Sequence, residues 1–91
     1  MEENKTTLEL IEEYAGLFLT IDEISLLLDL DPIQFRREIS AGKSADARAY
    51  QKGKLQSMLE MRRQTVMFAK KGSPQAESFV QEYIAKQQQN E

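Results

Sequence analysis

The sequence contains no cysteine, histidine or tryptophan, and it has only four glycines and two prolines among its 91 residues. The absence of cysteine excludes disulfides and is typical of a reducing compartment, so we expect a cytoplasmic protein. Without histidine and cysteine the chain lacks the common zinc ligands, the thiol nucleophile and the most frequent general base. We therefore expect no metal and no cofactor, and we predict that the protein is not an enzyme.

Long apolar runs are also missing. Acidic residues interrupt even residues 17–30, so no segment approaches the roughly 20 apolar residues that a membrane-spanning helix needs. The first five residues are acidic and lack the apolar core of a signal peptide. Hydrophobic residues make up 41% of the chain, which is enough for one modest core. We therefore expect no membrane partner.

The formal net charge of −3 hides a segregation of charge along the chain. Residues 1–31 contain nine acidic residues and one lysine, whereas residues 32–71 contain ten basic residues and three acidic ones. This distribution indicates either an anionic partner for the basic segment or pairing between the two segments. A long helix with solvated charges would have the same composition, so the fold must decide between these interpretations.

Capping signals divide the chain into helices. Thr20 and Glu23 have the spacing of a capping box, and Asp31 followed by Pro32 is typical of an N-cap and a first helical position. Gly42 is placed where it would end the next helix. No segment alternates apolar and polar residues with a period of two, so no strand is predicted. The sequence therefore predicts an all-α fold.

We predict a single domain over residues 1–91 that is built from two parts. Residues 7–42 are predicted to form an N-terminal three-helix unit with a helix-turn-helix. Residues 44–86 are predicted to form a helical hairpin of one long helix and one shorter helix, with the Gly-Ser-Pro sequence at 72–74 as its turn. Residues 87–91 have nothing apolar to bury and are expected to fray.

Residues 19–39 have the pattern of a helix-turn-helix, which is two short helices joined by a tight turn. The apolar residues predicted to set the crossing of these two helices are Ile24, Leu27, Leu28, Leu30, Phe35 and Ile39. The apolar residues predicted to cover the back of the pair are Leu8, Ile11, Ala15, Leu17 and Phe18. An ordinary antiparallel helix pair with a solvated outer face would produce the same pattern.

The outward face of the second short helix has the residue types of a recognition helix. In the major groove, glutamine such as Gln34 pairs with adenine, and arginine such as Arg37 pairs with guanine or phosphate. Asp29 and Asp31 oppose this interpretation, because their carboxylates repel phosphate. The predicted DNA-binding residues are Ile33, Gln34, Arg36, Arg37, Lys43 and Arg48, and the predicted ligand is double-stranded DNA.

The predicted long helix has more apolar side chains than one partner helix can cover, so we predict a homo-oligomer, either a dimer or a ring. Tyr50 and Gly53 lie one turn apart, and the missing side chain of Gly53 favours the close approach of another helix. A packing notch within one chain is the alternative interpretation of this pair. The residues assigned to oligomerisation are Tyr50, Gly53, Met58, Met61, Val66, Phe68, Phe79 and Tyr83.

Four short motifs follow one another over roughly residues 10–84. They are Thr20-Ile-Asp-Glu-Ile24, Asp31-Pro-Ile-Gln-Phe35, Ala49-Tyr-Gln-Lys-Gly53 and Ala69-Lys-Lys-Gly72-Ser-Pro-Gln-Ala76. Their order resembles that of phage terminase small subunits and related prophage helix-turn-helix proteins. The resemblance implies binding of viral DNA at a packaging site and assembly through the helices after the helix-turn-helix. It also implies a large terminase subunit as a partner, and it implies no catalysis in this chain.

The sequence departs from the pattern of that family at two positions of the helix-turn-helix. Asp29 stands where a turn glycine is common, and Ser25 stands where a small alanine packs the helix crossing. Aspartate tolerates a left-handed backbone and serine is small, so both residues fit the predicted fold. Little sequence follows the hairpin, which favours DNA binding over the packaging role. Two alternatives stay open: a small helix-turn-helix regulator of a mobile element, and an oligomeric helical adaptor that does not bind DNA.

Overall fold

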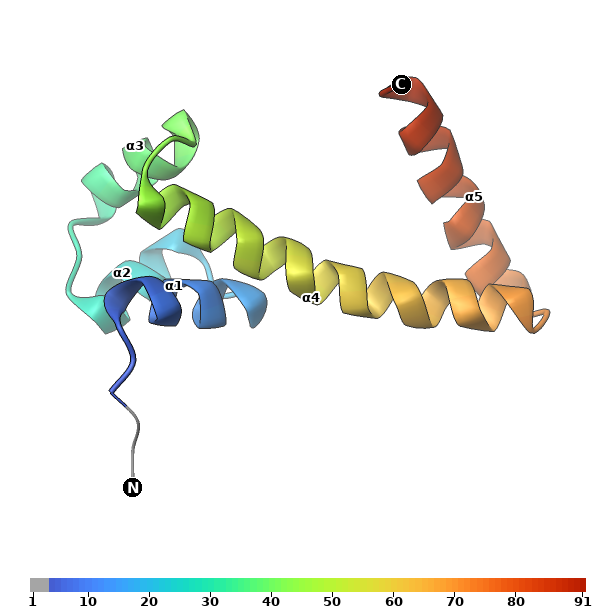
Figure 1. Ribbon diagram of the computed structural model, residues 1–91, viewed down its shortest axis with the longest axis horizontal. Helices are drawn as coiled ribbons and strands as arrows, with labels where there is room; N and C mark the ends of the chain where they lie inside the picture. The colour runs from blue at the N-terminus through green and yellow to red at the C-terminus, as the bar shows by residue number, and fades with distance from the viewer. Residues whose placement is uncertain (1–3) are drawn as a thin grey trace. The chain divides into compact units, whose positions relative to one another are not determined.

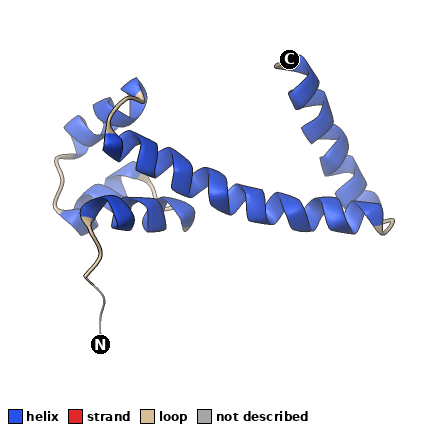
Figure 2. Cartoon of the chain, viewed as in Figure 1, coloured by secondary structure: helices blue, strands red, loops and turns tan. Residues whose placement is uncertain are grey.

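The structure, a computed structural model, describes residues 4–91, and this part of the chain contains five α-helices and no strand. The helices are α1 (Thr7–Gly16), α2 (Ile21–Leu28), α3 (Pro32–Ala41), α4 (Ala45–Lys70) and α5 (Pro74–Gln89). Short connections join them in the order of the chain (Figures 1 and 2). The predicted all-α fold class is thereby confirmed.

Two capping boxes determine where the first helices begin. The Thr20 hydroxyl accepts a hydrogen bond from the backbone N–H of Glu23 (3.1 Å), and the Glu23 carboxylate accepts one from the N–H of Thr20 (2.9 Å). Thr6 and Glu9 form the same reciprocal pair at the start of α1. The hydrogen bond from the Thr6 backbone lowers the pKa of Glu9. These pairs satisfy N–H groups that a helix start leaves without partners.

The turn between α2 and α3 depends on two aspartates. Asp29 ends α2 with a left-handed backbone (φ 56°, ψ 42°), which aspartate tolerates better than most side chains do. The Asp31 carboxylate then accepts a hydrogen bond from the N–H of Ile33 (3.0 Å), and Pro32 occupies the first helical position. Gly42 ends α3 with a φ of 72°. The sequence signals therefore identify both ends of α3 correctly.

The chain divides into two compact units, Met1–Met58 and Leu59–Glu91, and α4 is continuous across this division. The division therefore lies inside the long helix, and the first half of α4 belongs to the same unit as α1, α2 and α3. The reason is that the first half of α4 packs against α1. The hydroxyl of Ser57 on α4 donates a hydrogen bond to the carbonyl of Gly16 on α1 (2.7 Å).

The first unit has a small apolar core, in which α1 lies beside the first half of α4 (Figure 1). An ideal Cβ at Gly53 would lie only 2.1 Å from the carbonyl oxygen of Glu12, so α1 and α4 approach more closely than a side chain would permit. The Tyr50 ring meets the Phe35 ring edge-on, with centroids 6.4 Å apart. The buried core residues are Ile11, Ala15, Ile24, Phe35 and Ala49.

Part of the predicted core lies at the surface. Leu27 is exposed, because α2 turns its Ile24 and Ser25 side toward the other helices. Ser25 is only 2% exposed, and its hydroxyl donates a hydrogen bond to the carbonyl of Ile21 (2.8 Å). The other predicted core residues that are exposed are Leu8, Leu17 and Phe18. The back of the helix pair is therefore covered by Ile11 and Ala15 and not by this exposed set.

The second unit consists of the second half of α4, the turn at residues 71–73 and α5. The Ser73 hydroxyl caps α5 by accepting a hydrogen bond from the N–H of Ala76 (3.3 Å). The Arg62 guanidinium lies 4.0 Å from the centroid of the Tyr83 ring. Ala76 is the only buried residue among residues 59–91, all of which the structure describes. Helix α5 extends through residues 87–89, which the sequence predicts to fray.

Candidate functional site

Helix α3 presents four of the six predicted DNA-binding side chains at the surface. Phe35 is buried in the core of the first unit and thereby sets the rotation of α3 about its axis. Ile33 is 65% exposed, and Gln34, Arg36 and Arg37 are also exposed. The structure therefore exposes these four side chains on α3, because the side of the helix with Phe35 faces the core.

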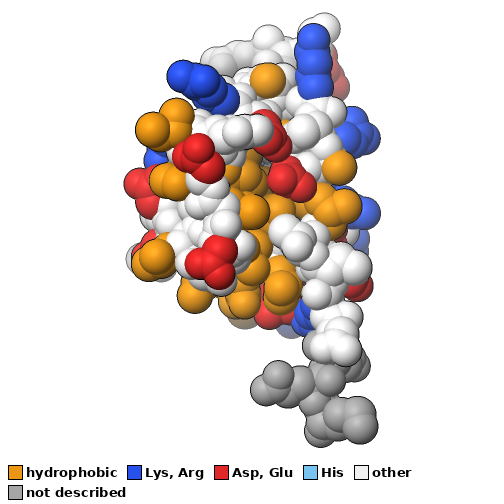
Figure 3. Space-filling model, turned by 90° about the vertical axis from the view of Figure 1, so that its left-hand side faces the viewer, with side chains coloured by type: hydrophobic (Ala, Val, Ile, Leu, Met, Phe, Trp, Pro, Cys, Tyr) orange, Lys and Arg blue, Asp and Glu red, His pale blue; other side chains and the backbone are white. Residues whose placement is uncertain are grey.

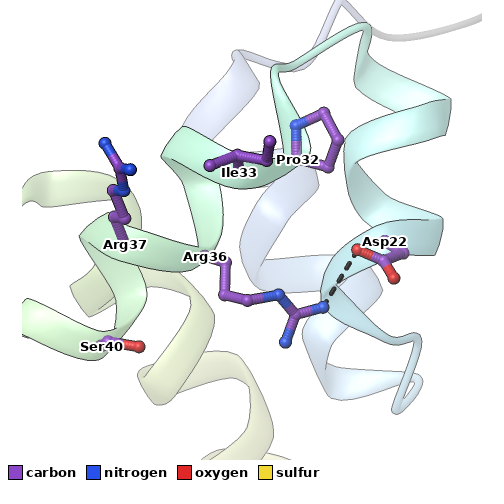
Figure 4. A pocket seen from close by; sticks show the side chains of 6 residues that line it. All are labelled: Asp22, Pro32, Ile33, Arg36, Arg37 and Ser40. Atoms are coloured by element: carbon purple, nitrogen blue, oxygen red, sulfur yellow. Dashed lines mark hydrogen bonds and ion pairs between the residues drawn. The ribbon is translucent and has the colours of Figure 1, made fainter.

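A hollow of about 630 Å³ lies against α2 and α3 (Figure 4). The Arg36 guanidinium reaches across it and pairs with the Asp22 carboxylate of α2 at 3.0 Å, whereas Arg37 points away from α2. Both partners of this ion pair are more than half exposed, so water screens the attraction between them. The residues that line the hollow are Asp22, Pro32, Ile33, Arg36, Arg37 and Ser40.

The side of α3 that faces the start of α4 is acidic. The Gln34 amide donates a hydrogen bond to the Glu38 carboxylate (3.3 Å), so Gln34 belongs to this side. Burial raises the pKa of Asp46 on α4, and the neighbouring Glu38 carboxylate raises it further. Asp31, Gln34, Glu38 and Asp46 all line one small hollow. These carboxylates would repel a polyanion. The part of α3 that suits phosphate is therefore the one with the two arginines, next to Ile33.

The two remaining predicted DNA-binding residues do not line the Arg36 hollow. Lys43 is exposed just after the end of α3. Arg48 lies on α4, in a separate hollow of about 360 Å³ whose lining includes the α1 residues Glu9 and Glu12. These carboxylates compete with a phosphate group for Arg48. The structure therefore places Arg48 in a different environment from the arginines of α3.

The residues predicted for oligomerisation separate into three groups. Tyr50 and Gly53 pack within the first unit, against Phe35 and Glu12, so the close helix approach predicted at Gly53 occurs inside one chain. This contact fits the alternative interpretation of the pair, a packing notch within one chain. Two others are half-buried, Val66 and Tyr83, and four are exposed: Met58, Met61, Phe68 and Phe79.

The sequence predictions miss an apolar surface on α2. Leu26 is 80% exposed and lines a hollow of about 490 Å³ together with Asp22, Ser25, Asp29, Leu30 and Pro32. A signal for this surface is present in the sequence. Consecutive helical residues point about 100° apart, so the three leucines at 26–28 cannot all face one core.

Other types of site are absent from the described part of the chain. Among residues 4–91, no group of three or more acidic residues, histidines or cysteines is arranged to hold a metal ion. No helix in the same range has an apolar stretch of the length that crossing a bilayer requires. Comparison with protein-family models, with curated proteins and with solved structures finds no match to this chain.

Proposed function

We propose that this chain is a non-catalytic DNA-binding protein in which α2 and α3 act as a helix-turn-helix and α3 is the recognition helix. The observation that carries the proposal is the exposed side of α3 with Arg36, Arg37 and Ile33. Arginine contacts guanine or phosphate, and an apolar side chain such as isoleucine contacts the methyl group of thymine. The resemblance to phage terminase small subunits favours viral DNA as the ligand and a large terminase subunit as a further partner.

The charge distribution gives independent support to this proposal. The basic segment over residues 32–71 starts at α3 and continues along α4. Contacts between basic side chains and phosphate supply most of the sequence-independent affinity for DNA. A small regulator of a mobile element would use the same side of α3, so the packaging role rests on the resemblance alone.

Asp22→Asn is expected to tighten binding to duplex DNA by about threefold. The substitution removes a negative charge next to the proposed phosphate path and releases the Arg36 guanidinium from its ion pair. Fluorescence anisotropy with a labelled duplex at about 50 mM salt measures the change in Kd.

The matched control for this experiment is Glu77→Gln in the first turn of α5. It removes one negative charge from the second unit and is expected to leave the Kd nearly unchanged. If both substitutions tightened binding equally, only net charge would matter, and the assignment of α3 as the recognition helix would be wrong.

We further propose that the second unit associates with the same unit of another copy. Its buried interior is a single alanine, Ala76, which is too little apolar burial to hold a unit of this size together. Met61, Phe68 and Phe79 are each exposed. Exposed apolar side chains gathered on a small unit mark an interaction surface.

Sedimentation equilibrium at micromolar concentration tests this self-association. A mass above the 10.5 kDa of one chain is expected, and the variant Phe68→Glu is expected to lower it. Gln56→Glu introduces the same charge at an exposed position on another side of the same helix, in the part that belongs to the first unit, and serves as the control. A single species of 10.5 kDa for the unmodified protein would refute the association.

A further inference from the structure

The two arginines of α3 have different surroundings. The Arg36 guanidinium donates a hydrogen bond from Nη2 to the Asp22 carboxylate (3.0 Å), whereas Arg37 takes part in no ion pair within residues 4–91. Figure 4 shows Arg36 directed across the hollow toward α2 and Arg37 directed away from α2. The two side chains therefore meet a bound duplex differently, although they are neighbours in the sequence and carry the same charge.

The ion pair between Arg36 and Asp22 contributes little to the stability of the first unit. The side chain of Asp22 is 71% exposed and that of Arg36 is 55% exposed, so water screens their attraction. The position of Asp22 is nevertheless well defined, because it lies in the first turn of α2, directly after the capping-box residue Thr20 and Ile21. The positive end of the helix dipole favours a carboxylate there. Asp22 therefore gives the Arg36 guanidinium a fixed acceptor on the neighbouring helix.

The Asp22 carboxylate has opposite effects on the two DNA groups that an arginine binds. Pro32 and Ile33 form apolar walls of the hollow, so a duplex that covers it excludes water. The effective dielectric constant then falls, which strengthens both the Arg36–Asp22 attraction and the repulsion between Asp22 and a phosphate. Guanine presents neutral acceptors, O6 and N7, in the major groove. The carboxylate therefore disfavours a phosphate next to Arg36 and tolerates a guanine there.

Arg36 also retains the hydrogen-bond donors that recognition of guanine requires. A guanidinium has five N–H groups in a planar fork, and Asp22 accepts a hydrogen bond from only one of its nitrogens. A guanine accepts two hydrogen bonds from such a fork, at O6 and N7. Arg37, which no carboxylate holds in the described part of the chain, is the side chain that suits phosphate.

We propose that Asp22 is a positioning residue that holds Arg36 for a guanine in the major groove and keeps it away from phosphate. Asp22 has this role only if α3 binds DNA, so the proposal rests on the proposed function. Acidic side chains also stand among apolar ones on the face where the α2–α3 connection lies (Figure 3). Repulsion of a competing group is a general source of specificity, because it lowers the affinity for the wrong ligand.

The guanine preference of the full chain is measured in two steps. Selection from a library of duplexes with a randomised segment identifies the preferred sequence. Each guanine of the selected duplex is then replaced by 7-deazaguanine, which pairs normally with cytosine and lacks the N7 acceptor. The ratio of the two Kd values, measured by fluorescence anisotropy, is the guanine preference. For the unmodified protein, at least one guanine is expected at which the replacement weakens binding about tenfold.

Asp22→Ala is expected to lower this preference from about tenfold to about twofold and to tighten binding to a duplex without the preferred sequence. Arg37→Ala is the matched control on α3. It removes a phosphate contact, so it is expected to weaken binding to all duplexes and to leave the guanine preference unchanged. In the Arg36→Ala background, Asp22→Ala is expected to change the preference no further, because Asp22 acts through Arg36. Far-UV circular dichroism verifies that the variants are folded.

The outcomes separate this proposal from the proposed function. An Asp22→Ala variant that keeps the full guanine preference, or an Arg37→Ala variant that loses it, would overturn the roles assigned to these residues. A chain that binds duplex DNA without a sensitive guanine would also overturn them and would leave the proposed DNA binding intact. Absence of binding to any duplex would overturn both.

Discussion

Gly53→Ala is expected to destabilise the first unit by about 3 kcal/mol, although alanine is the better helix former. The new Cβ would lie 2.1 Å from the carbonyl oxygen of Glu12 and 2.9 Å from its carbonyl carbon. Both are backbone atoms of α1, so no side-chain rotation relieves the clash. Helix α1 would have to move away from α4, which opens the core around Ile11 and Ala15.

The midpoint of urea unfolding, together with an unchanged slope, measures this loss. Gly16→Ala is the matched control on the other side of the same helix contact. Its new Cβ would lie 2.9 Å from the hydroxyl oxygen of Ser57, a flexible side chain that can turn aside, and 3.3 Å from the backbone carbonyl oxygen of Gly53, a contact that a small shift relieves. A smaller loss of about 1 kcal/mol, one hydrogen bond, is expected there. Equal midpoints for the two variants would contradict the close packing of α1 on α4.

The double variant Arg36→Ala with Arg37→Ala is expected to weaken binding to duplex DNA by at least about tenfold. Each arginine that contacts a guanine or a phosphate contributes about 1 kcal/mol or more, and both side chains line the exposed hollow at α3. Both are exposed, so their removal is expected to leave the stability of the first unit nearly unchanged. Fluorescence anisotropy at one salt concentration measures the change in affinity.

The control for the double variant is Lys70→Ala with Lys86→Ala, which removes the same positive charge from exposed positions of the second unit. Its effect on affinity is expected to be clearly smaller. If the control weakened binding as much as the α3 variant does, DNA would be following the general positive charge of the chain, and α3 would have no special role.

The helix ends are predictable from the sequence because the signals are local. A capping box such as Thr20 with Glu23 needs only two residues three positions apart, and Asp31 with Pro32 needs only neighbours. The left-handed backbone of Asp29 follows from the same kind of local reasoning. Arg36 and its neighbours on α3 are exposed because Phe35, the buried aromatic residue of this helix, faces the core.

The features that the sequence could not predict depend on how helices cross. Nothing local distinguishes Leu27 from Ser25 as the inward residue of α2, because the position of α3 decides between them. The partner of Gly53 is set by the packing of α1 on α4 and not by any residue near it in the chain. Phe18 adopts a positive φ of 64° after α1, a conformation for which its residue type gives no signal.

In the candidate site, too, contacts within one helix are predictable from the sequence and contacts between helices are not. The hydrogen bond between Gln34 and Glu38 spans four residues of one helix and was available from the sequence. The ion pair between Arg36 and Asp22 joins two helices, and only the structure reveals it. That pair matters for the proposed function, because it occupies one of the two arginines with which α3 would approach DNA.

The central claim is that this chain binds duplex DNA through its basic side chains, and the salt dependence of binding by the unmodified protein tests it most directly. The affinity for a duplex is measured by fluorescence anisotropy over a series of salt concentrations. We expect the logarithm of the association constant to fall linearly with the logarithm of the salt concentration, with a slope of about −0.9 for each phosphate contacted. No detectable binding at about 50 mM salt, or an affinity that does not change with salt, would contradict it.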